Sequence, residues 1–455
     1  MSSFGIGGTN AHVVLGDIVI PSERTGTGTG IETETGRSEL LVLSARSEAA
    51  LDRMSHQLAE RLDPAATAGS EHPPAGELGD VAWTLAVGRR PLPVRRTVVC
   101  RSADEARRAL LGRAPERLRT RKIARSAAPV AFLFPGQGAQ FPAMAGAVHA
   151  ECARFRDRFE DALAAVAEID DELAATLRRL LLRRGGDDDG AAHALADTAL
   201  TQPALFVVEA ALAGMWTDRG LSPVALLGHS IGELVAAHHA GVMSLADAAR
   251  LVVMRGRLMA GAPSGQMVAV RAPRETVAGW LAELGDDRTV VAAHNSPTDC
   301  VVGGPAAAVA AVIERATQEA IQHRVLRTSH AFHGPLMAGA VEPFRAEVAR
   351  ATLSPPQIPV LSNRSGTWLT DDQATSPSYW AEHLVHPVRF AEGVATLLGE
   401  TGAVLLEAGP GRSLATLVRR CAAETVVAIP SLSQAADNEQ RGGRAGLLEA
   451  MSGLW

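Results

Sequence analysis

The feature that most constrains this chain is an apolar segment that ends in a glycine-flanked serine and continues into helix-forming residues. Residues 224–227 are apolar, residues 228–232 read Gly-His-Ser-Ile-Gly, and after Glu233 the helix-forming residues Leu, Val and Ala follow. Glycines at both ends let a strand and a helix approach closely, which leaves the serine on a sharp, exposed turn. The pattern predicts a nucleophilic Ser230 in an α/β fold, with a purely structural tight turn as the alternative.

Two backbone amides near this turn are candidates for stabilising an oxyanion. The amide of Ile231 stands at the expected start of the helix, where N–H groups point toward developing negative charge. A glycine-rich turn at 135–138 follows an expected strand at 130–134, and its Gln137 supplies a second candidate amide. An ordinary strand-to-helix turn is the alternative interpretation of Gln137.

Length and composition exclude several classes of protein. The 455 residues, 47% hydrophobic and 21% charged, indicate a globular chain of two or three structural units. A formal net charge of −6 predicts neither nucleic acid nor a membrane surface as partner, and charge, Gly or Pro interrupts every apolar stretch. The four cysteines are far apart, so we expect no disulfide framework and no zinc site, and a cytoplasmic location fits best.

A small α/β unit is expected over residues 37–127, after a linker at 25–36 that repeats Thr, Gly and Glu. Strands are expected at 40–45 and 95–100, helices at 47–62, 81–87 and 103–111, and a basic bridge at 117–125.

A larger unit follows, in which strands, glycine-rich turns and helices alternate, and this predicts a parallel α/β sheet. Its helices are expected at 155–168, 172–182, 202–216 and 245–259. From residue 266 the order becomes β-α-β-β-α-β, which predicts an inserted ferredoxin-like unit. An apolar stripe at 447–455 predicts a tail that packs back on the fold.

A nucleophilic serine needs a base, and two neighbouring histidines are placed to supply it. His330 and His333 follow the last strand of the insert, where a strand gives way to a helix. Site residues gather at the carboxyl edge of a parallel sheet, which favours His333. His330 stays open as the alternative base.

Arg255 suggests an anionic ligand. It lies in the expected helix 245–259, whose apolar positions indicate burial. A buried guanidinium requires an anionic partner, which a substrate carboxylate would supply in a bidentate pair. A structural salt bridge to Asp or Glu is the alternative.

Five motifs occur together in the order and spacing of a known family. They are Phe-Pro-Gly-Gln-Gly-Ala-Gln at 134–140, Gly-His-Ser-Ile-Gly-Glu at 228–233, Met-Arg-Gly-Arg at 254–257, Asn-Ser-Pro at 295–297 and His-Ala-Phe-His at 330–333. The chain closely resembles malonyl-CoA:acyl-carrier-protein transacylases, and in detail the acyltransferase domain of a modular type I polyketide synthase. The resemblance extends over essentially the whole chain.

The resemblance implies a hydrolase-like parallel-sheet subdomain with an inserted ferredoxin-like subdomain, preceded by a small α/β linker domain. The implied segments are a ketosynthase remnant with a flexible linker at 1–36, a ketosynthase-acyltransferase linker domain at 37–127, the acyltransferase domain at 128–424 and a post-acyltransferase linker at 425–455. Within the acyltransferase domain, the large subdomain would comprise 128–263 and 328–424, and the small one 264–327.

The resemblance also assigns roles to the matching residues. Ser230 would be the acylated nucleophile and His333 its base, and the amides of Gln137 and Ile231 would form the oxyanion hole. Arg255 would bind the free carboxylate of the extender unit.

Four further residues are implied at the substrate end of the site, with less direct roles. A backbone carbonyl near His383, where the family often carries Gln or Asn, would orient the base. Asn295 and His330 are expected close to the substrate. Phe332 would exclude a methyl branch, because methylmalonyl enzymes typically carry a smaller Ser there. One methyl group is worth only about 1 to 3 kcal/mol of discrimination, so methylmalonyl stays open as the alternative substrate.

The implied function is ping-pong transfer of a malonyl group from malonyl-CoA to the phosphopantetheine thiol of an acyl carrier protein. No metal and no permanently bound cofactor is expected. The expected partners are the carrier protein, the ketosynthase and other domains of the same megasynthase, and His12 resembles a ketosynthase histidine that we expect to be idle here. A serine hydrolase that edits acyl groups and a docking scaffold with an inactive acyltransferase are the alternatives.

Overall fold

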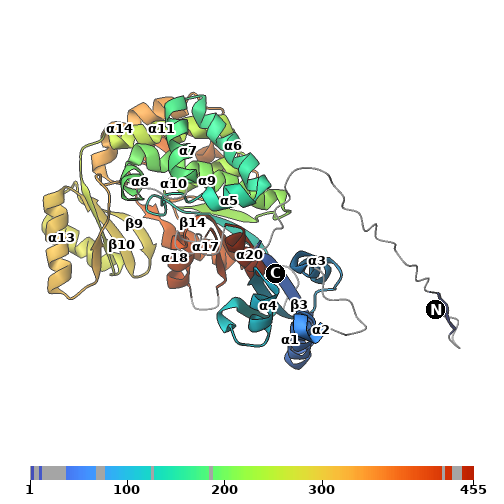
Figure 1. Ribbon diagram of the computed structural model, residues 1–455. Helices are drawn as coiled ribbons and strands as arrows, with labels where there is room; N and C mark the ends of the chain where they lie inside the picture. The colour runs from blue at the N-terminus through green and yellow to red at the C-terminus, as the bar shows by residue number, and fades with distance from the viewer. Residues whose placement is uncertain are drawn as a thin grey trace. The chain divides into compact units, whose positions relative to one another are not determined.

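The computed structural model shows two units, Met1–Arg37 and Ser38–Trp455 (Figure 1). In the first unit, β1 (Ser2–Phe4) pairs antiparallel with β2 (Asn10–His12). The expected linker at 25–36 lies outside the described residues. The structure describes residues 2–4, 10–12, 37–67, 77–123, 128–183, 188–422, 426–432 and 443–455.

The second unit begins with a three-stranded antiparallel sheet and its helices. The central strand β4 (Val94–Cys100) pairs with β3 (Glu39–Ala45) on one side and with β5 (Leu118–Lys122) on the other. Helices α1 (Glu48–Arg61) and α4 (Ala103–Leu110) contribute Leu51 and Ala106, which are fully buried, to a core of their own. A further helix, α3 (Leu78–Val87), also lies against β3.

The prediction of a basic bridge at 117–125 was wrong, because five of these residues form the strand β5. This edge strand pairs through its backbone with β4, while Arg119 and Arg121 are exposed. An edge strand of this kind carries charged side chains instead of an apolar alternation. The hydrophobic pattern therefore gave no signal for it.

A five-stranded parallel sheet forms the centre of the larger part, as predicted. Its order is β12-β7-β6-β14-β15, and all four neighbouring pairs are parallel. Helices α9 and α18 both contact β14, and in Figure 1 α9 lies above the strand and α18 below it. The strands are β6 (Val130–Phe134), β7 (Ala225–Gly228), β12 (Val360–Leu361), β14 (Val404–Pro410) and β15 (Ala428–Leu432).

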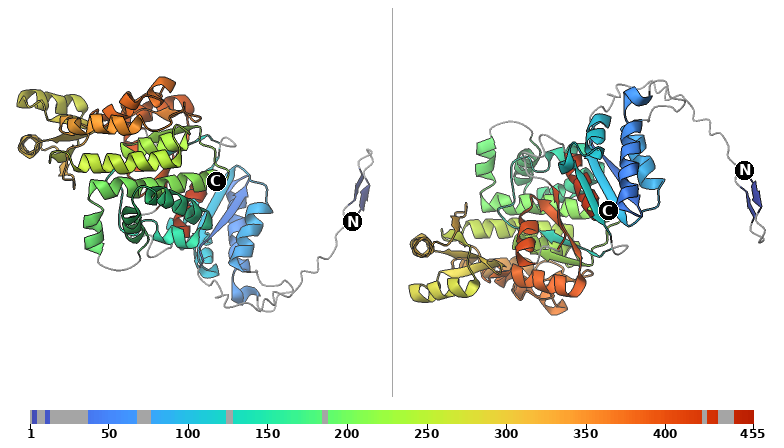
Figure 2. Two further views of the ribbon diagram at one scale, coloured as in Figure 1. Left: turned by 90° about the horizontal axis from the view of Figure 1, so that it is seen from above. Right: turned by 90° about the horizontal axis from the view of Figure 1, so that it is seen from below.

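The helices of the large part surround this sheet (Figure 2). They include α6 (Ala153–Ala167), α7 (Asp171–Leu182), α9 (Thr198–Asp218), α10 (Ile231–His239), α11 (Leu245–Ala260), α14 (Ala338–Val348), α17 (Phe390–Thr401) and α18 (Ser413–Cys421).

Helix α9 (Thr198–Asp218) is longer than expected. It begins four residues before residue 202, because the side chain of Asp197 accepts a hydrogen bond from the amide of Ala199 at 2.9 Å. Among the described residues it is the one helix long and apolar enough to cross a membrane, contrary to the sequence expectation, and 78% of its most apolar window is buried inside the fold. It packs against α6, α10 and α11, as a core helix does.

The ferredoxin-like insert is confirmed. Strands β8 (Gln266–Val270), β9 (Val290–Ser296), β10 (Asp299–Gly304) and β11 (His323–Val325) pair antiparallel in the order β11-β8-β10-β9, with helices α12 (Arg274–Leu284) and α13 (Ala306–Gln318). A two-residue strand from outside the insert, β13 (Val388–Arg389), extends this sheet by pairing parallel with β9. It is too short to predict from a pattern.

The C-terminal helix α20 (Gly443–Leu454) packs back on the fold, as the apolar stripe predicted. It contacts β15 of the parallel sheet and also β3 and β4 of the small sheet. Leu447 is buried in the large core, and the guanidinium of Arg444 lies 3.0 Å from the carboxylate of Glu39. The helix therefore connects the small sheet to the parallel-sheet part.

Candidate functional site

Ser230 lies in the turn between β7 and α10 (Ile231–His239), where the backbone is strained. Its φ and ψ angles are 54° and −114°, a region that residues with a β-carbon rarely adopt. A β-carbon on Gly228 would overlap the amide nitrogen of Glu233, and one on Gly232 would overlap the carbonyl oxygen of Phe134. Both glycines are therefore required for the serine to stand at this turn.

The hydroxyl of Ser230 is hydrogen-bonded to the imidazole of His333, which lies 103 residues further along the chain. The distance between Ser230 Oγ and His333 Nε2 is 2.7 Å. The other ring nitrogen, Nδ1, lies 3.1 Å from the carbonyl oxygens of His383 and His386. Because two carbonyls can only accept, Nδ1 carries the proton and Nε2 is free to accept the proton of the serine.

The surroundings of His333 favour its neutral form. The side chain is buried, and its backbone has a φ of 58°, which directs the ring toward the turn of Ser230. Burial, followed by the nearby imidazole of His383 and the guanidinium of Arg255, lowers the pKa of His333 well below 6.5. The imidazole is thus available as a base at neutral pH.

Arg255 extends from α11 to the same hydroxyl. Its Nη2 lies 3.3 Å from Ser230 Oγ, and its Nη1 donates to the side-chain oxygen of Gln202 at 2.7 Å. The side chain is 1% exposed, and its Nε has no hydrogen-bond partner in the part of the chain that the structure describes. A buried guanidinium with an unused donor faces the nucleophile.

Arg255 makes no ion pair with a carboxylate of the described residues, so the structural salt bridge left open by the sequence is not formed there. Burial lowers its pKa to about 9, and the more distant charge of Glu233 opposes this shift. A buried cation without a carboxylate partner of its own can bind an anion from outside the chain.

A buried polar group lies behind the turn at residues 228–232, which we call the elbow. It holds Ser230, the candidate nucleophile, in place. The side chain of Asn363 accepts a hydrogen bond from the amide of Ser230 and donates one to the carbonyl of Gly228, both at 2.7 Å. The carboxylate of Glu233 accepts from the amide of Asn363 at 2.7 Å and from the hydroxyl of Tyr379, the single tyrosine of the chain. These contacts clamp the strained turn between α10 and the end of β12.

Asn295 and Phe332 lie around the site without touching the serine hydroxyl. The side-chain oxygen of Asn295 lies 2.8 Å from Nε2 of His229, the residue before the nucleophile. Phe332 is 7% exposed and stacks on the ring of His330, with centroids 6.3 Å apart. Nδ1 of His330 contacts the hydroxyl of Ser329, so the structure brings His333 and not His330 to the nucleophile.

The two candidate amides of the oxyanion hole belong to neighbouring turns. Ile231 opens α10, directly after the nucleophile. Gly136 packs against the elbow so closely that a β-carbon there would lie 2.7 Å from the carbonyl oxygen of His229, and this places the turn of Gln137 beside it. The side chain of Gln137 is held by a 3.2 Å hydrogen bond to Thr198.

A serine, an imidazole and an unpaired guanidinium thus converge where the parallel sheet meets the insert, and the sequence of this part matches one enzyme family. The family model described as "Acyl transferase domain" matches residues 131–448. The chain belongs to the acyl transferase domain family. A second model, "CurL-like, PKS C-terminal", matches residues 39–110 of this acyltransferase. The resemblance to the acyltransferase domains of polyketide synthases is therefore confirmed.

Curated relatives of this acyltransferase are large polyketide synthases. It is 37% identical over 428 residues to the spectinabilin polyketide synthase system protein NorB of Streptomyces orinoci, covering 93% of this chain and 19% of that protein. It is 36% identical to mycoketide-CoA synthase of Mycobacterium tuberculosis, covering 94% of this chain and 10% of the relative. The chain thus spans about a fifth or less of the length of these two proteins.

Solved structures show the same fold. The acyl transferase domain of SpnD, in complex with 2-(pent-4-yn-1-yl)malonyl, is 34% identical, with a TM-score of 0.80 and coverage of 92% of this chain and 96% of that domain. The malonyl-CoA:acyl carrier protein transacylase of Xanthomonas oryzae pv. oryzae is 32% identical, with a TM-score of 0.61 and coverage of 72% and 99%. These likenesses confirm the two-subdomain α/β fold and the acyltransferase class.

Sequence reasoning missed Asn363 and Tyr379, and it quoted Glu233 only as part of a motif. A signal for Asn363 existed, because a polar Ser-Asn pair directly follows the apolar strand β12 and the carboxyl ends of parallel strands lie together. Its contacts with the acyltransferase elbow span more than 130 residues, which no local pattern reveals.

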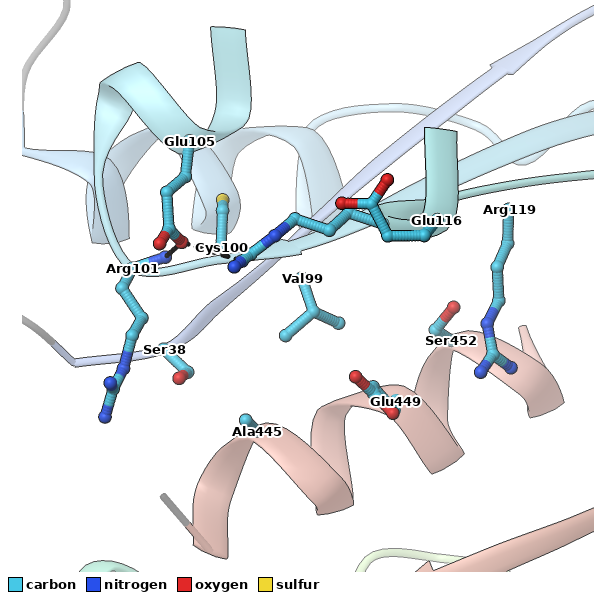
Figure 3. Close-up of a pocket in the computed structure, with 11 residues that line it drawn as sticks. Ser38, Val99, Cys100, Arg101, Glu105, Glu116, Arg119, Ala445, Glu449 and Ser452 are labelled. Carbon is cyan, nitrogen blue, oxygen red and sulfur yellow. Dashed lines mark hydrogen bonds and ion pairs between the residues drawn. The ribbon is translucent and has the colours of Figure 1, made fainter. Parts of the chain in front are cut away.

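One pocket of the acyltransferase lies away from this site, between β4, α4 and the C-terminal helix α20 (Figure 3). Its lining includes Arg101 and Glu105 on one side and Glu449 and Ser452 on the other, and none of the residues gathered around Ser230. Within the described part of the chain, no group of three or more His, Cys, Asp or Glu residues is arranged to hold a metal ion. The chemistry of Ser230, and not the shape of this pocket, locates the candidate site.

Proposed function

We propose that this acyltransferase moves a malonyl group from malonyl-CoA to the phosphopantetheine thiol of an acyl carrier protein, through an ester on Ser230. The observation that carries the proposal is the state of Arg255, a buried guanidinium 3.3 Å from the serine hydroxyl with no carboxylate partner among the described residues. A malonyl ester keeps a free carboxylate at its far end. That carboxylate supplies the anion that the guanidinium lacks.

In the first half-reaction, Oγ of Ser230 attacks the thioester carbonyl of malonyl-CoA while Nε2 of His333 takes the hydroxyl proton. The carbonyl oxygen becomes an oxyanion, and the amides of Gln137 and Ile231 are the donors we assign to it. The carbon–sulfur bond then breaks, the CoA thiolate receives the proton from the imidazolium, and malonyl-Ser230 remains. The 2.7 Å contact between Oγ and Nε2 supports the first proton transfer.

In the second half-reaction, the carrier thiol gives its proton to His333 and attacks the ester carbonyl. The ester carbon–oxygen bond breaks and Ser230 takes the proton back. The carbonyls of His383 and His386 keep the imidazole in the tautomer that both halves need, so no acidic third member is required. His383 therefore contributes its backbone, and we assign substrate contact to Arg255 and Phe332 instead.

Malonyl is the extender unit that the side chains around the site favour. Phe332 is packed and nearly fully buried beside His333, and we assign to its ring the space that a branched extender unit would need. The SpnD domain binds a malonyl group with a long branch, so a substituted malonyl is the competing substrate. We assign selection against that branch to Phe332 and Ile231.

The wider assignments follow from the curated relatives, which are multidomain polyketide synthases. We propose that residues 37–127 are the linker domain after a ketosynthase, that 128–424 are the acyltransferase domain, and that 425–455 are the linker that follows it. The carrier protein and the other domains of one megasynthase are the proposed partners. We assign no permanently bound cofactor, because serine, histidine and arginine supply every proton and charge of the scheme.

Intact-mass measurement tests the proposal. Incubation with malonyl-CoA is expected to add one malonyl group to the wild-type chain and none to Ser230→Ala. Incubations with methylmalonyl-CoA and acetyl-CoA are expected to give less adduct. An adduct that persists in Ser230→Ala would overturn the assignment of the nucleophile, and CoA release without any adduct would favour an acyl hydrolase.

A further inference from the structure

The ring of His383 is an unusual group in the site. It is 1% exposed, and neither of its nitrogens makes a hydrogen bond to another described residue. Its centroid lies 5.6 Å from that of His333, with the rings at 87°, so one edge faces the catalytic base. Its backbone carbonyl accepts a hydrogen bond from Nδ1 of His333. The proposed reaction uses this carbonyl and gives no role to the ring of His383.

A carboxylate stands on the far side of this ring. Nε2 of His383 lies 3.3 Å from a carboxylate oxygen of Glu233, which is fully buried. The contact is close enough for an ion pair but not aligned as a hydrogen bond. Glu233 makes this contact with His383 and none with His333 within the described part of the chain, so its negative charge favours a proton on His383.

Other charged and titratable groups also face the pair of imidazoles. The hydroxyl of Tyr379 on α16 (Pro377–Glu382) donates a hydrogen bond to the carboxylate of Glu233. The guanidinium of Arg255 on α11 and the imidazole of His229 in the elbow both lower the pKa of His333. They therefore disfavour the protonated form of His333. The ring of His386 lies further out, with its side chain 46% exposed beside Glu382.

We propose that His383 is a positioning residue that keeps His333 in its basic form: Glu233 draws the first proton of the imidazole pair to His383, and the charged ring opposes a second proton on His333. Two imidazoles this close interact, so a positive charge on one ring disfavours a positive charge on the other. The carboxylate of Glu233 makes the two rings unequal, because among them it contacts only the ring of His383. His333 therefore keeps its free Nε2 to a lower pH than an isolated imidazole in the same place.

This inference rests on the proposed acyl transfer, since His333 must be the base whose protonation stops the reaction. It adds a role for the side chain of His383, in a position where the backbone alone orients the base. A glutamine there would retain the carbonyl and a polar side chain, and would lose only the titratable ring.

The test is the pH dependence of the rate of Ser230 malonylation, followed by quenched-flow intact mass from pH 5 to pH 8. In His383→Gln the midpoint of the acid limb is expected to rise by about one pH unit, because a proton on His333 is no longer opposed. The matched control is His386→Gln, which keeps the second carbonyl on Nδ1 and removes a half-exposed ring. Its midpoint is expected to stay at the wild-type pH, whatever its rate.

The outcomes separate the two proposals. A lower rate in His383→Gln with an unmoved midpoint would show that the ring only packs, and would overturn this inference alone. An equal shift in His386→Gln would assign the effect to the loop as a whole and would also overturn it. Failure of the wild-type chain to be malonylated at any pH would instead overturn the proposed function. Circular dichroism and the thermal midpoint of each variant establish that it is folded.

Discussion

Arg255 and Ser230 are joined by a contact of 3.3 Å between guanidinium nitrogen and hydroxyl oxygen, although they lie on different elements 25 residues apart. One cation thus stands at the atom that we propose to be acylated. An acyl group that ends in a carboxylate can stay on this cation while its other end is bound to the serine. An acyl group without a carboxylate leaves the cation buried and unpaired, so the contact selects by charge.

Replacing Arg255 by alanine is expected to separate malonyl from acetyl loading. Loss of a buried charged pair costs about 3 kcal/mol, or about 100-fold in the rate of malonylation, whereas acetylation should change much less. Loading rates from malonyl-CoA and acetyl-CoA measure the two effects. The control is Arg257→Ala, which removes a partly exposed arginine of the same helix that pairs with Asp170. Equal losses for both substrates would contradict the assigned role of Arg255.

The elbow should not tolerate a side chain at Gly232. Alanine there would overlap the carbonyl oxygen of Phe134, a backbone atom of the central strand β6, and is expected to destabilise the fold by about 2 kcal/mol or more. Urea denaturation measures the change. Gly279→Ala is the matched control. A β-carbon at this position of helix α12 would meet no described atom within 4 Å outside the neighbouring backbone of its own helix, so the change should be neutral or slightly stabilising. Equal stability of the two variants would contradict the close packing at the elbow.

The sequence predicts the local features of the site better than its long-range contacts. A glycine pattern, a strand-to-helix junction and an arginine in a largely apolar helix are local signals, and they predicted Ser230, the pair His330 and His333, and Arg255 as candidate site residues. The strand β5 was missed because its charged residues lack the apolar alternation by which a strand is predicted. It is recognised as a strand only by its backbone pairing with β4. Asn363 and Glu233 hold the elbow through bonds that span 133 and 130 residues, and such contacts exist only after the sheet has formed.

Phe332 is expected to control branching of the extender unit. Phe332→Ser would open space beside His333, and the ratio of methylmalonyl to malonyl loading is expected to rise about 10-fold, as one methyl in an apolar pocket is worth about 1 to 3 kcal/mol. Competition between the two CoA esters, read by intact mass, measures the ratio. Total loading by both esters serves as the internal control. An unchanged ratio would assign selectivity to other residues.

The burial of the Glu209 carboxyl group leads us to expect that the stability of the fold depends on pH, independently of catalysis. Glu209 is fully buried on α9, and its carboxylate oxygens have no hydrogen-bond partner among the residues that the structure describes. Burial, with the charge of Glu407, raises its pKa well above 4.5. Above pH 4.5 the unfolded chain releases a proton that the folded carboxyl keeps, so stability is lost as pH rises toward the folded pKa. Glu209→Gln is therefore expected to lose less stability than wild type between pH 6 and pH 8.

Urea denaturation at the two pH values compares wild type with Glu209→Gln and with the control Glu314→Gln, which replaces an exposed carboxylate. The control should follow wild type. The same loss of stability in all three chains would contradict the assignment to Glu209.

The most direct test of the account follows the acyl group after it has been loaded. The chain is charged with labelled malonyl-CoA, freed of excess CoA ester, and mixed with a carrier protein bearing phosphopantetheine. If Ser230 holds malonate for transfer, the label moves from the chain to the carrier thiol and little free malonate appears. Release of the label mainly as free malonate, at the same rate with and without the carrier, would contradict the account and identify a hydrolase.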